Sequence, residues 1–438
     1  MMHFTSTRIL TAAGLVSLGL ALGAQAATVT RGPYLQLPTP NSMTVRWRTD
    51  TATDSRVAYG AAPGSLSSNA DDLTLTTEHV VTVSGLAVNA QYYYSVGSIG
   101  GAFVGDDADH YFRTNPTPGV AAPVRIFATG DGGYMNYPPN PVLSAHAMAV
   151  RDAYTTFTGS TPTNLFLPLG DNAYITSTDA EMQLAIFNGF HDFLRTTPIL
   201  PVYGNHEQFS SSTLTQTGPF FNAFSLPSAA QAGGVASGSE TYFSLDYANV
   251  HIIFLDTERA QPANAGTMMT WLAADLAAAN ADWTIALWHR PPYSRGLLHN
   301  SDIEAEEKWA RENIVPVLEA YGVDAVFNGH SHSYERSYFL NGHYGLAATF
   351  NASFQRDPGD GKPAGDGAYR KTALGATANS GAVYVVAGSS SEVRPATLDH
   401  PAHGVGLLEF GALVLDIDGN TLTSQFLNEF GVVTDNFQ

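Results

Sequence analysis

Five short motifs combine aspartate, asparagine, histidine or tyrosine with a turn-forming residue, and each stands at the end of an apolar run. In chain order they are Gly130-Asp131-Gly132-Gly133, Gly170-Asp171-Asn172-Ala173-Tyr174, Gly204-Asn205-His206-Glu207, Trp288-His289-Arg290 and Gly329-His330-Ser331-His332. Carboxylate, amide oxygen, imidazole and phenolate all bind iron, manganese or zinc. No thiolate competes with them, because the chain contains no cysteine. The motifs therefore predict a metal site.

The number of candidate ligands suits two neighbouring metals. One ligand must then bridge them, and a carboxylate can do so with its two oxygens, which makes Asp131 and Asp171 the candidates. Two metals about 3.5 to 4 Å apart clamp the attacking and leaving oxygens of an in-line displacement and generate hydroxide near neutral pH. Phosphoryl transfer is the reaction that fits this chemistry.

Each motif alone also has a simpler interpretation. Gly-Asp-Gly-Gly is usually a turn, Asp171 and Asn205 could be helix N-caps, and Tyr174 or His289 could be ordinary core residues. His330 and His332 are stronger evidence, because alternate residues on an extended segment point the same way and can reach neighbouring metals. The conjunction of five motifs, in this order and at strand ends, favours the metal site.

Buried strands are expected to position these motifs, since ligands of α/β sheets collect at the carboxyl ends of the strands. Apolar runs typical of such strands alternate with stretches typical of helices. The expected strands are 124–128, 164–169, 199–203, 250–255, 284–288 and 325–327, and the expected helices are 141–157, 179–194, 266–280 and 302–321. The pattern predicts an α/β domain. Long loops are expected over 341–404, apart from a strand-like run at 382–387, and strands with a turn at 418–420 follow.

A separate all-β unit is expected ahead of this domain. Short alternating runs separated by Pro, Gly, Ser, Asn and Asp fill residues 28–114 and are typical of a β-sandwich like a fibronectin type III module. The proline-rich segment 115–123 has no periodic pattern and is the expected linker. We therefore predict a sandwich domain over 27–114 and a catalytic domain over 124–438. Two domains also suit a chain of 438 residues.

Residues 1–26 have the features of a signal peptide. They carry one formal charge, Arg8, and an apolar stretch from Ile9 to Ala24, and they end in Ala24-Gln25-Ala26, so cleavage after Ala26 is expected. A membrane anchor is the alternative, but small and polar residues interrupt the apolar run. The prediction is a secreted or periplasmic protein. Without cysteine, its stability must come from core burial and bound metal.

The formal net charge of −19 argues against nucleic acid as a partner. Such an acidic surface repels polyanions at long range. An anionic substrate would need local positive charge at its site, and a metal cluster could supply it. After the signal peptide, we expect no segment that spans a membrane, and the expected partner is a small phosphate ester.

The ordered series GDGG, GDNAY, GNHE, ALWH and GHSH resembles the five-block signature of the purple acid phosphatases, within the calcineurin-like metallophosphoesterases. Arg31-Gly-Pro-Tyr-Leu-Gln36 and Gly329-His-Ser-His-Ser-Tyr-Glu-Arg336 are similar to further motifs of that family, so the resemblance spans nearly the whole mature chain. It implies an acid phosphatase that hydrolyses phosphate monoesters by attack of a metal-bound hydroxide, with a metallophosphoesterase domain of two sheets flanked by helices. The sequence departs from the family pattern at Ala286, where the family usually has valine. This is a strand packing position and carries no chemistry.

The resemblance also implies a binuclear centre of Fe(III) and a divalent iron, zinc or manganese. The implied ligands are Asp131, Asp171, Tyr174 and His332 for Fe(III), and Asp171, Asn205, His289 and His330 for the divalent metal, with Asp171 bridging. Tyr174 marks the purple subgroup, since a phenol with a pKa of about 10 binds as phenolate only to a strong Lewis acid. His206 and His299 resemble family histidines that orient phosphate and protonate the leaving group.

Two other functions stay open. One is a metal-dependent phosphodiesterase of the same superfamily, which would be colourless and prefer a diester. The other is a surface-binding protein in which the sandwich does the work and the phosphatase domain is inactive, although the complete ligand set argues against it. His299 could also be an exposed loop histidine, and His400 and His403 match no family motif.

Overall fold

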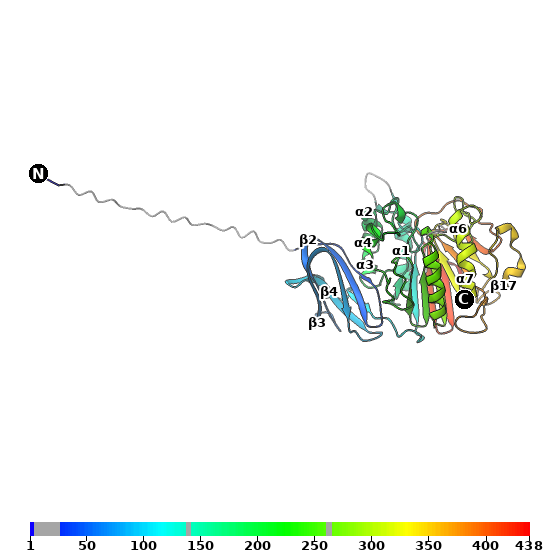
Figure 1. The fold of residues 1–438 in the computed structure, drawn as a ribbon, viewed down its shortest axis with the longest axis horizontal. Helices are drawn as coiled ribbons and strands as arrows, with labels where there is room; N and C mark the ends of the chain where they lie inside the picture. Colours follow the sequence, from blue (N-terminus) through cyan, green and yellow to red (C-terminus); the bar gives the residue numbers. More distant parts are fainter. Residues whose placement is uncertain (4–26, 137–141, 260–264) are drawn as a thin grey trace.

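This computed structural model describes residues 1–3, 27–136, 142–259 and 265–438. The predicted signal peptide, residues 1–26, therefore lies outside the described residues apart from its first three, and so does Pro141, where one helix was expected to begin. A β-rich unit comes first, and a larger α/β unit lies beside it (Figure 1). Within the described ranges, no helix combines the length and apolarity that a membrane crossing requires.

The first unit is built from six strands, all paired antiparallel. They are β1 Val29–Gln36, β2 Ser42–Gly60, β3 Ser68–Ser84, β4 Gln91–Ser98, β5 Gly101–Gly105 and β6 Tyr111–Arg113. Alternate residues of one strand point to the same face, and on β2 these are Met43, Val45 and Trp47, which are buried against Val81 and Val83 of β3. The long β2 arches across the unit in Figure 1 and pairs with β1, β3 and β4. The predicted all-β unit is confirmed.

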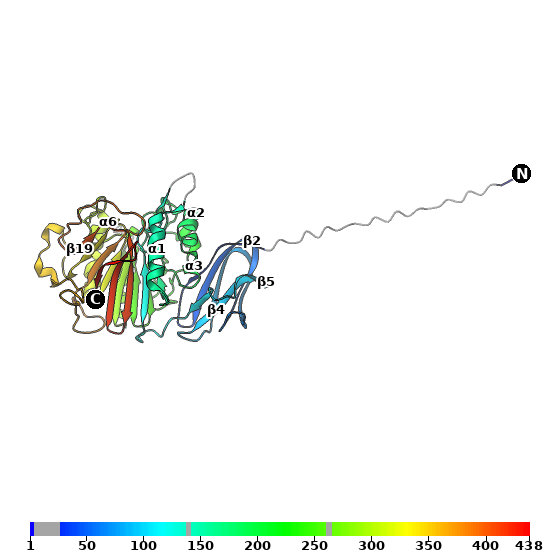
Figure 2. The ribbon, with the colours of Figure 1, turned by 180° about the vertical axis from the view of Figure 1, so that it is seen from behind.

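Two sheets form the centre of the second unit. The five-stranded sheet has the order β10-β7-β20-β21-β22, and the seven-stranded sheet has the order β11-β12-β13-β14-β18-β15-β19. Their strands are β7 Val124–Ala128, β10 Leu165–Phe166, β11 Phe243–Tyr247, β12 Val250–Phe254, β13 Trp283–Trp288, β14 Ala325–Asn328, β15 Tyr334–Ser337, β18 Val383–Ala387, β19 His403–Leu407, β20 Gly411–Asp418, β21 Thr421–Asn428 and β22 Val433–Phe437. Figure 2 shows these strands from behind. Two short pairs are β8 Met135–Asn136 with β9 Val142–Leu143, and β16 Phe339–Leu340 with β17 Gln355–Asp357.

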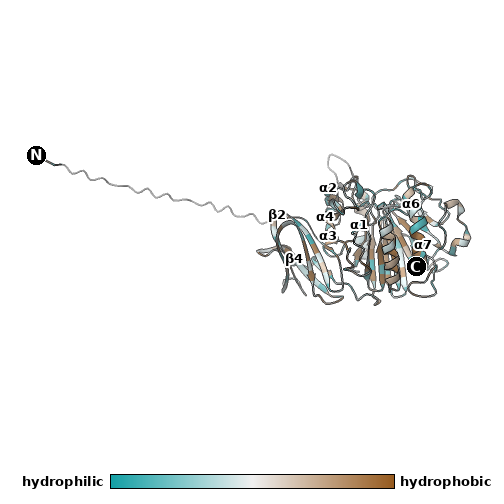
Figure 3. Ribbon diagram, viewed as in Figure 1, coloured by the Kyte–Doolittle hydropathy of each residue, from teal (hydrophilic) through white to brown (hydrophobic). Residues whose placement is uncertain are grey.

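Burial on both faces explains the apolar runs of the central strands. Ile252 and Phe254 of β12 join one core cluster with residues from the five-stranded sheet, whereas Ile253, between them, packs into a second cluster with Met268 and Leu272 of a helix. Figure 3 shows the resulting concentration of hydrophobic residues on the strands. Parallel strands covered on both faces read as continuous apolar runs, so the predicted α/β domain with two sheets and flanking helices is confirmed.

Short helices surround the sheets. They are α1 Ala145–Thr158, α2 Asp179–Met182, α3 His191–Leu194, α4 Pro219–Ala223, α5 Gly266–Ala278, α6 Ala305–Trp309 and α7 Val315–Ala320, with π-helical segments at Gln183–Asn188 and Ala310–Ile314. Side chains cap the N-termini of two of these helices. The Ser144 hydroxyl accepts a hydrogen bond from the Ala147 amide at the start of α1, and Thr178 and Glu181 form a capping box at the start of α2. The helix predicted over 179–194 is therefore present, but it is divided into three segments.

Prolines explain where the strand predictions fail. The strand at 124–128 is confirmed, and those at 250–255, 284–288 and 325–327 are confirmed within one residue. The strand predicted at 199–203 is wrong, since only Ile199 forms a single parallel bridge, to Phe166. The Leu200 and Val202 amides donate to the carbonyls of Phe166 and Pro168 at 3.0 and 2.8 Å, but Pro168 has no amide hydrogen to donate in return, so the ladder does not continue. Pro168 lies in the strand predicted at 164–169, which is reduced to β10.

The Arg31–Gln36 motif of β1 attaches the first unit to the second. The buried Arg31 guanidinium donates to Asp179 Oδ1 at 2.8 Å and to Gln183 Oε1 at 2.6 Å. The Tyr34 hydroxyl donates to the Ala223 carbonyl at 2.7 Å, and the Ile199 amide donates to the Leu35 carbonyl at 3.0 Å. The motif thus supports α2, which begins five residues after the candidate ligand Tyr174.

His251 of β12 is a buried ion-pair partner away from the five motifs. Its Nδ1 lies 2.7 Å from Asp246 Oδ1 on β11, and its Nε2 lies 2.9 Å from Asp275 Oδ2 on α5. Burial disfavours the charged ring, but the hydrogen bonds to these two carboxylates outweigh it and raise the pKa of His251 to about 9. Since the pKa of the unfolded residue is about 6.5, this stabilisation is fully present below pH 6.5 and is lost as the pH rises through 9.

Replacing His251 by Gln is therefore expected to destabilise the fold in a pH-dependent way. The loss in free energy of unfolding should be about 3 kcal/mol larger at pH 6 than at pH 10. Urea unfolding of both proteins at the two pH values measures the difference. His191→Gln, on the exposed side of α3 beside Asp192, is the matched control and should change little. An equal loss at both pH values would show that His251 acts only through packing.

Candidate metal centre

The predicted ligands lie at the carboxyl ends of parallel strands from both sheets. Strands β7 and β10 are parallel in one sheet, and β12, β13, β14 and β18 are parallel in the other. Asp131 follows β7, Asp171 and Tyr174 follow β10, Asn205 follows the bridge at Ile199, His289 follows β13, and His330 and His332 follow β14. The structure brings all seven residues together at one edge of the two sheets.

The loops that carry the ligands have unusual backbone conformations. Asp131, Asp171 and His330 have positive φ angles of 54°, 51° and 69°, a region that non-glycine residues seldom adopt and that clusters at functional sites. The loops also approach one another closely. A Cβ at Gly170 would lie 2.4 Å from Nδ1 of His289, and one at Gly204 would lie 2.3 Å from the Asp171 amide nitrogen. Glycine before Asp171 and before Asn205 is required for this packing.

One group of side chains forms around the phenol of Tyr174. Its hydroxyl lies 2.8 Å from Asp131 Oδ1, 3.1 Å from Asp171 Oδ2 and 3.3 Å from His332 Nε2. His332 Nε2 is also 3.4 Å from Asp131 Oδ1. All four side chains are buried. These are the four residues expected to share one metal.

A second group forms around His289. Its Nε2 lies 3.3 Å from Asp171 Oδ1, 3.1 Å from Asn205 Oδ1 and 3.3 Å from His330 Nδ1. Potential ligand atoms of Asp171, His289 and His330 all lie within 4.8 Å of one another. Asp171 therefore belongs to both groups, with Oδ2 facing Tyr174 and Oδ1 facing His289. A carboxylate in this position is placed to bridge two ions.

The outer ring nitrogens of the three histidines each contact a fixed acceptor. Nδ1 of His289 lies 2.8 Å from the Leu169 carbonyl, Nδ1 of His332 lies 2.8 Å from Glu392 Oε2, and Nε2 of His330 lies 3.0 Å from Glu304 Oε2. In the neutral ring the outer nitrogen then carries the proton, and the inner nitrogen directs its lone pair toward the group. Metal-ligating histidines are held in this way, so the donor set fits a metal pair.

The electrostatics around the carboxylates of Asp171 and Asp131 favour positive charge. Burial favours the neutral ring of His289, but the carboxylates of Asp171 and Asp131 outweigh it and raise the pKa of His289 to about 10. Burial and the same two carboxylates raise the pKa of Tyr174 well above its ordinary value. Burial would raise the pKa of Asp171 as well, yet the neighbouring His289 holds it below its usual range. A multivalent cation would satisfy these carboxylates and permit the phenol to ionise.

His206 and His299 lie on two sides of the group. The His206 amide donates to Asp171 Oδ1 at 2.8 Å, its Nδ1 lies 2.6 Å from the Ile175 carbonyl, and its ring centre is 4.4 Å from that of Tyr174. The His299 ring centre is 3.8 Å from that of His330. Both imidazoles keep about a fifth to a quarter of their surface exposed. The structure thus places both beside the buried ligands, with access to solvent.

Three glutamates at the site had no role in the sequence prediction. Glu304 contacts His330 through Oε2, as described, and accepts from Nδ1 of His299 through Oε1 at 2.8 Å. Glu392 contacts His332. Glu207 accepts from the amides of Asn172 at 2.9 Å and Gly204 at 2.8 Å, so it joins two ligand loops. Glu207 is part of a quoted motif, whereas no motif marks Glu304 or Glu392.

A second cluster could also offer ligand atoms to a metal. It consists of His299, Glu304 and His330, whose potential ligand atoms all lie within 4.8 Å of one another. The guanidinium of Arg290 lies 2.7 Å from Glu304 Oε2 and 3.1 Å from His330 Nε2. A cation there would meet this positive charge, so the geometry disfavours a metal at this second group. The unassigned His400 and His403 lie elsewhere, with His403 Nδ1 3.0 Å from Glu335 Oε2 and the two ring centres 5.0 Å apart.

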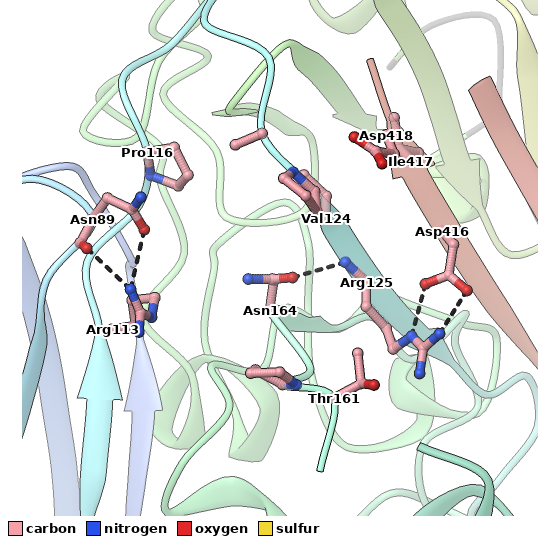
Figure 4. A pocket seen from close by; sticks show the side chains of 13 residues that line it. Asn89, Arg113, Pro116, Val124, Arg125, Thr161, Asn164, Asp416, Ile417 and Asp418 are labelled. Carbon is pink, nitrogen blue, oxygen red and sulfur yellow. Dashed lines mark hydrogen bonds and ion pairs between the residues drawn. The ribbon is translucent and has the colours of Figure 1, made fainter. Parts of the chain in front are cut away.

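A cavity of about 410 Å³ lies at the opposite ends of the strands, between the two units (Figure 4). Its polar groups satisfy one another: Arg125 forms a bidentate pair with Asp416, and Arg113 donates to Asn89. None of the seven predicted ligands lines it. This cavity is a crevice beside the linker and takes no part in the candidate metal centre.

Two family models match the chain. One is described as calcineurin-like phosphoesterase and matches residues 146–334; the other is described as purple acid phosphatase, N-terminal domain, and matches residues 31–114. Among curated proteins, purple acid phosphatase 15 of Arabidopsis thaliana is 28% identical over 273 residues, which cover 59% of this chain and 49% of that protein. Purple acid phosphatase 18 of the same plant is 26% identical, covering 72% and 68%. The chain spans about half the length of the first of these relatives.

Solved structures share the fold. The purple acid phosphatase PPD1 of yellow lupin seeds matches with a TM-score of 0.64 and 17% identity, covering 94% of this chain and 73% of that one. The structure of PhoD matches with a TM-score of 0.61 and 11% identity, covering 90% and 85%. Because these two matches cover 94% and 90% of this chain, they include both the β-rich unit and the α/β unit.

Proposed function

Because the chain belongs to the purple acid phosphatase family of the calcineurin-like phosphoesterases, we propose that it is a binuclear-metal acid phosphatase that hydrolyses phosphate monoesters. One observation carries the proposal. The two oxygens of the buried Asp171 carboxylate face two separate groups of potential ligands, one around Tyr174 and one around His289. That arrangement supports two metals bridged by Asp171.

The proposed ligands divide as the geometry groups them. Fe(III) would be held by Asp131, Asp171, Tyr174 and His332, and a divalent iron, zinc or manganese would be held by Asp171, Asn205, His289 and His330. Tyr174 supports ferric iron at the first position, because burial and two carboxylates oppose ionisation of its phenol unless a strong Lewis acid binds it. When bound, the two metals supply a hydroxide nucleophile at neutral pH and stabilise charge on the attacking and leaving oxygens.

The neighbouring histidines orient the ester and move a proton. His206 is fixed by the hydrogen bond from its amide to Asp171 and by the Ile175 carbonyl at Nδ1, so the doubly protonated ring can donate from Nε2 to a phosphate oxygen. His299 is fixed by Glu304 at Nδ1, so the doubly protonated ring carries at Nε2 the proton that it gives to the departing alcohol. Glu304 and Glu392 hold the rings of His330 and His332 at their outer nitrogens.

The remaining expectations complete the proposal. The mature chain begins after cleavage at Ala26 and acts outside the cytoplasm, with a fibronectin type III-like sandwich over 27–114, a linker over 115–123 and the catalytic domain over 124–438. The acidic overall charge supports a small phosphate ester as partner over nucleic acid. The complete donor set argues against an inactive domain that serves only surface binding.

A comparison of two substrates tests the proposal. The purified protein is expected to hydrolyse p-nitrophenyl phosphate with a kcat/KM at least about tenfold above that for bis-p-nitrophenyl phosphate, since a monoester leaves more phosphate oxygens for the metals and His206. Release of p-nitrophenol under matched conditions measures both. A colourless protein that contains only manganese or zinc and prefers the diester would be a phosphodiesterase, and a protein that hydrolyses neither would contradict the enzymatic proposal.

A further inference from the structure

Large apolar side chains stand exposed on both sides of the candidate metal centre. They are Ile175, Phe209, Leu297, Leu298 and Ile303, with exposed fractions of 44%, 67%, 63%, 61% and 75%. Single exposed apolar residues are ordinary, whereas several gathered beside a polar site mark a binding surface. We call these five residues the apolar rim.

The rim is attached to the two histidines that flank the ligands. Ile175 follows Tyr174 directly, and its carbonyl lies 2.6 Å from Nδ1 of His206. The Phe209 ring centre is 5.7 Å from that of His206. On the other side, Leu297 and Leu298 immediately precede His299 in the chain, and Ile303 precedes Glu304, which holds His299. Both histidines therefore have exposed apolar side chains next to them, either in the chain or in ring contact.

Two arginines beside the centre, Arg290 and Arg394, are already paired with carboxylates. Arg290 contacts Glu258 at 2.9 Å and Glu304 at 2.7 Å. Arg394 donates to both oxygens of Glu392, at 3.1 and 3.0 Å. A substrate with further phosphate groups needs additional cationic donors to hold them. These two arginines would have to leave carboxylates in order to serve it.

From these two observations we propose that the site takes phosphate monoesters of apolar alcohols, alkyl or aryl, and disfavours polyphosphates. This inference rests on the proposed function and concerns only the leaving group. The single phosphate would lie at the proposed metal ligands. With the ester oxygen at His299 the carbon chain would cover Leu298, Leu297 and Ile303, and with the ester oxygen at His206 it would cover Phe209 and Ile175.

A series of n-alkyl phosphates tests the inference, because ethyl, butyl, hexyl and octyl phosphate have leaving groups of nearly equal basicity and differ in apolar length. Phosphate release below the micellar concentration of each ester gives kcat/KM. We expect kcat/KM to rise by about twofold per added methylene up to hexyl, about half of what complete burial gives. ATP is expected to be hydrolysed at least about tenfold less efficiently than hexyl phosphate.

The variants Phe209→Ser and Leu298→Ser locate the effect. Each is expected to reduce the chain-length slope while leaving kcat/KM for ethyl phosphate within about twofold of the parent. Leu73→Ser is the matched control, because Leu73 is 73% exposed on β3 of the first unit, and it should leave the slope unchanged.

Three results would overturn the inference, and they are distinguishable. Equal kcat/KM for all alkyl esters removes the apolar preference but keeps the phosphatase. An unchanged slope in the variants, together with a changed oligomeric state by size-exclusion chromatography, would make the rim a contact between copies of the chain. Hydrolysis of none of the esters would contradict the proposed function itself, and this inference with it.

Discussion

An Asp171→Ala variant is expected to lose at least about 10³-fold in kcat/KM for a phosphate monoester, equivalent to about 4 kcal/mol of transition-state stabilisation. The carboxylate of Asp171 faces Tyr174 through one oxygen and His289 through the other, at 3.1 and 3.3 Å, so its removal opens both groups of ligands at once. Asp131 also contacts residues of both groups through its two oxygens, but in the second group it accepts from the backbone amide of His330 instead of facing a ligand side chain. The loss in kcat/KM on replacing Asp171 should therefore exceed the loss on replacing a ligand that belongs to one group alone.

Metal binding distinguishes this effect from unfolding. The parent protein is expected to be stabilised against heat by added iron or zinc, because ligands that bind only the folded state raise its stability. The Asp171→Ala variant should keep its circular dichroism spectrum but lose this stabilisation. Asp152→Ala, on the exposed side of α1, is the control and should retain both activity and metal response. Activity near the parent level in Asp171→Ala would show that this carboxylate does not hold the metals that catalysis needs.

A His299→Asn variant is expected to lose about 10²-fold in kcat for an alkyl phosphate but less than about tenfold for p-nitrophenyl phosphate. General-acid catalysis contributes most where the leaving group is strongly basic, and p-nitrophenolate departs without a proton. His299 is placed for this role, with its ring 3.8 Å from that of His330 and its Nδ1 held by Glu304. Steady-state rates with the two substrates measure the ratio directly.

Glu304→Gln is the companion variant, since one carboxylate holds both His299 and His330. It should reproduce part of the leaving-group dependence and, unlike His299→Asn, weaken metal retention on dialysis by about 10- to 100-fold. Glu312→Gln, on an exposed position of the following helical segment, is the matched control. An equal loss on both substrates in His299→Asn, with no change in metal retention in Glu304→Gln, would show that neither residue acts as described.

The motif residues could be found from the sequence because their positions follow from strand ends and close loop packing. Gly170 and Gly204 mark points where a side chain would collide with His289 or Asp171, so the glycines and the ligands occur together in the chain. Likewise, the apolar run of β12 reflects burial on both faces. These are local consequences of the fold, and the corresponding predictions of strands and of the α/β architecture are confirmed.

Residues that support the ligands from distant segments of the chain could not be predicted from local sequence motifs. Glu304 and Glu392 stand in no glycine-rich motif, and they meet His330 and His332 only because distant segments converge at the sheet edge. The strand expected at 199–203 fails for a related reason, since its apolar pattern is that of a strand while Pro168 of the neighbouring segment lacks the amide donor that the ladder needs. The ligand roles assigned to the seven residues stay predictions of the chemistry that this geometry permits.

Metal content measured together with the absorption spectrum tests the central claim most directly. The purified protein is expected to carry two metals per chain, one of them iron, and to show a visible tyrosinate-to-ferric charge-transfer band that disappears in Tyr174→Phe. The reason is that the Tyr174 phenol, at 2.8 Å from Asp131 and 3.3 Å from His332, is the phenolate candidate of the ferric position. A fully active protein with a single metal, or a band that survives in Tyr174→Phe, would contradict the account.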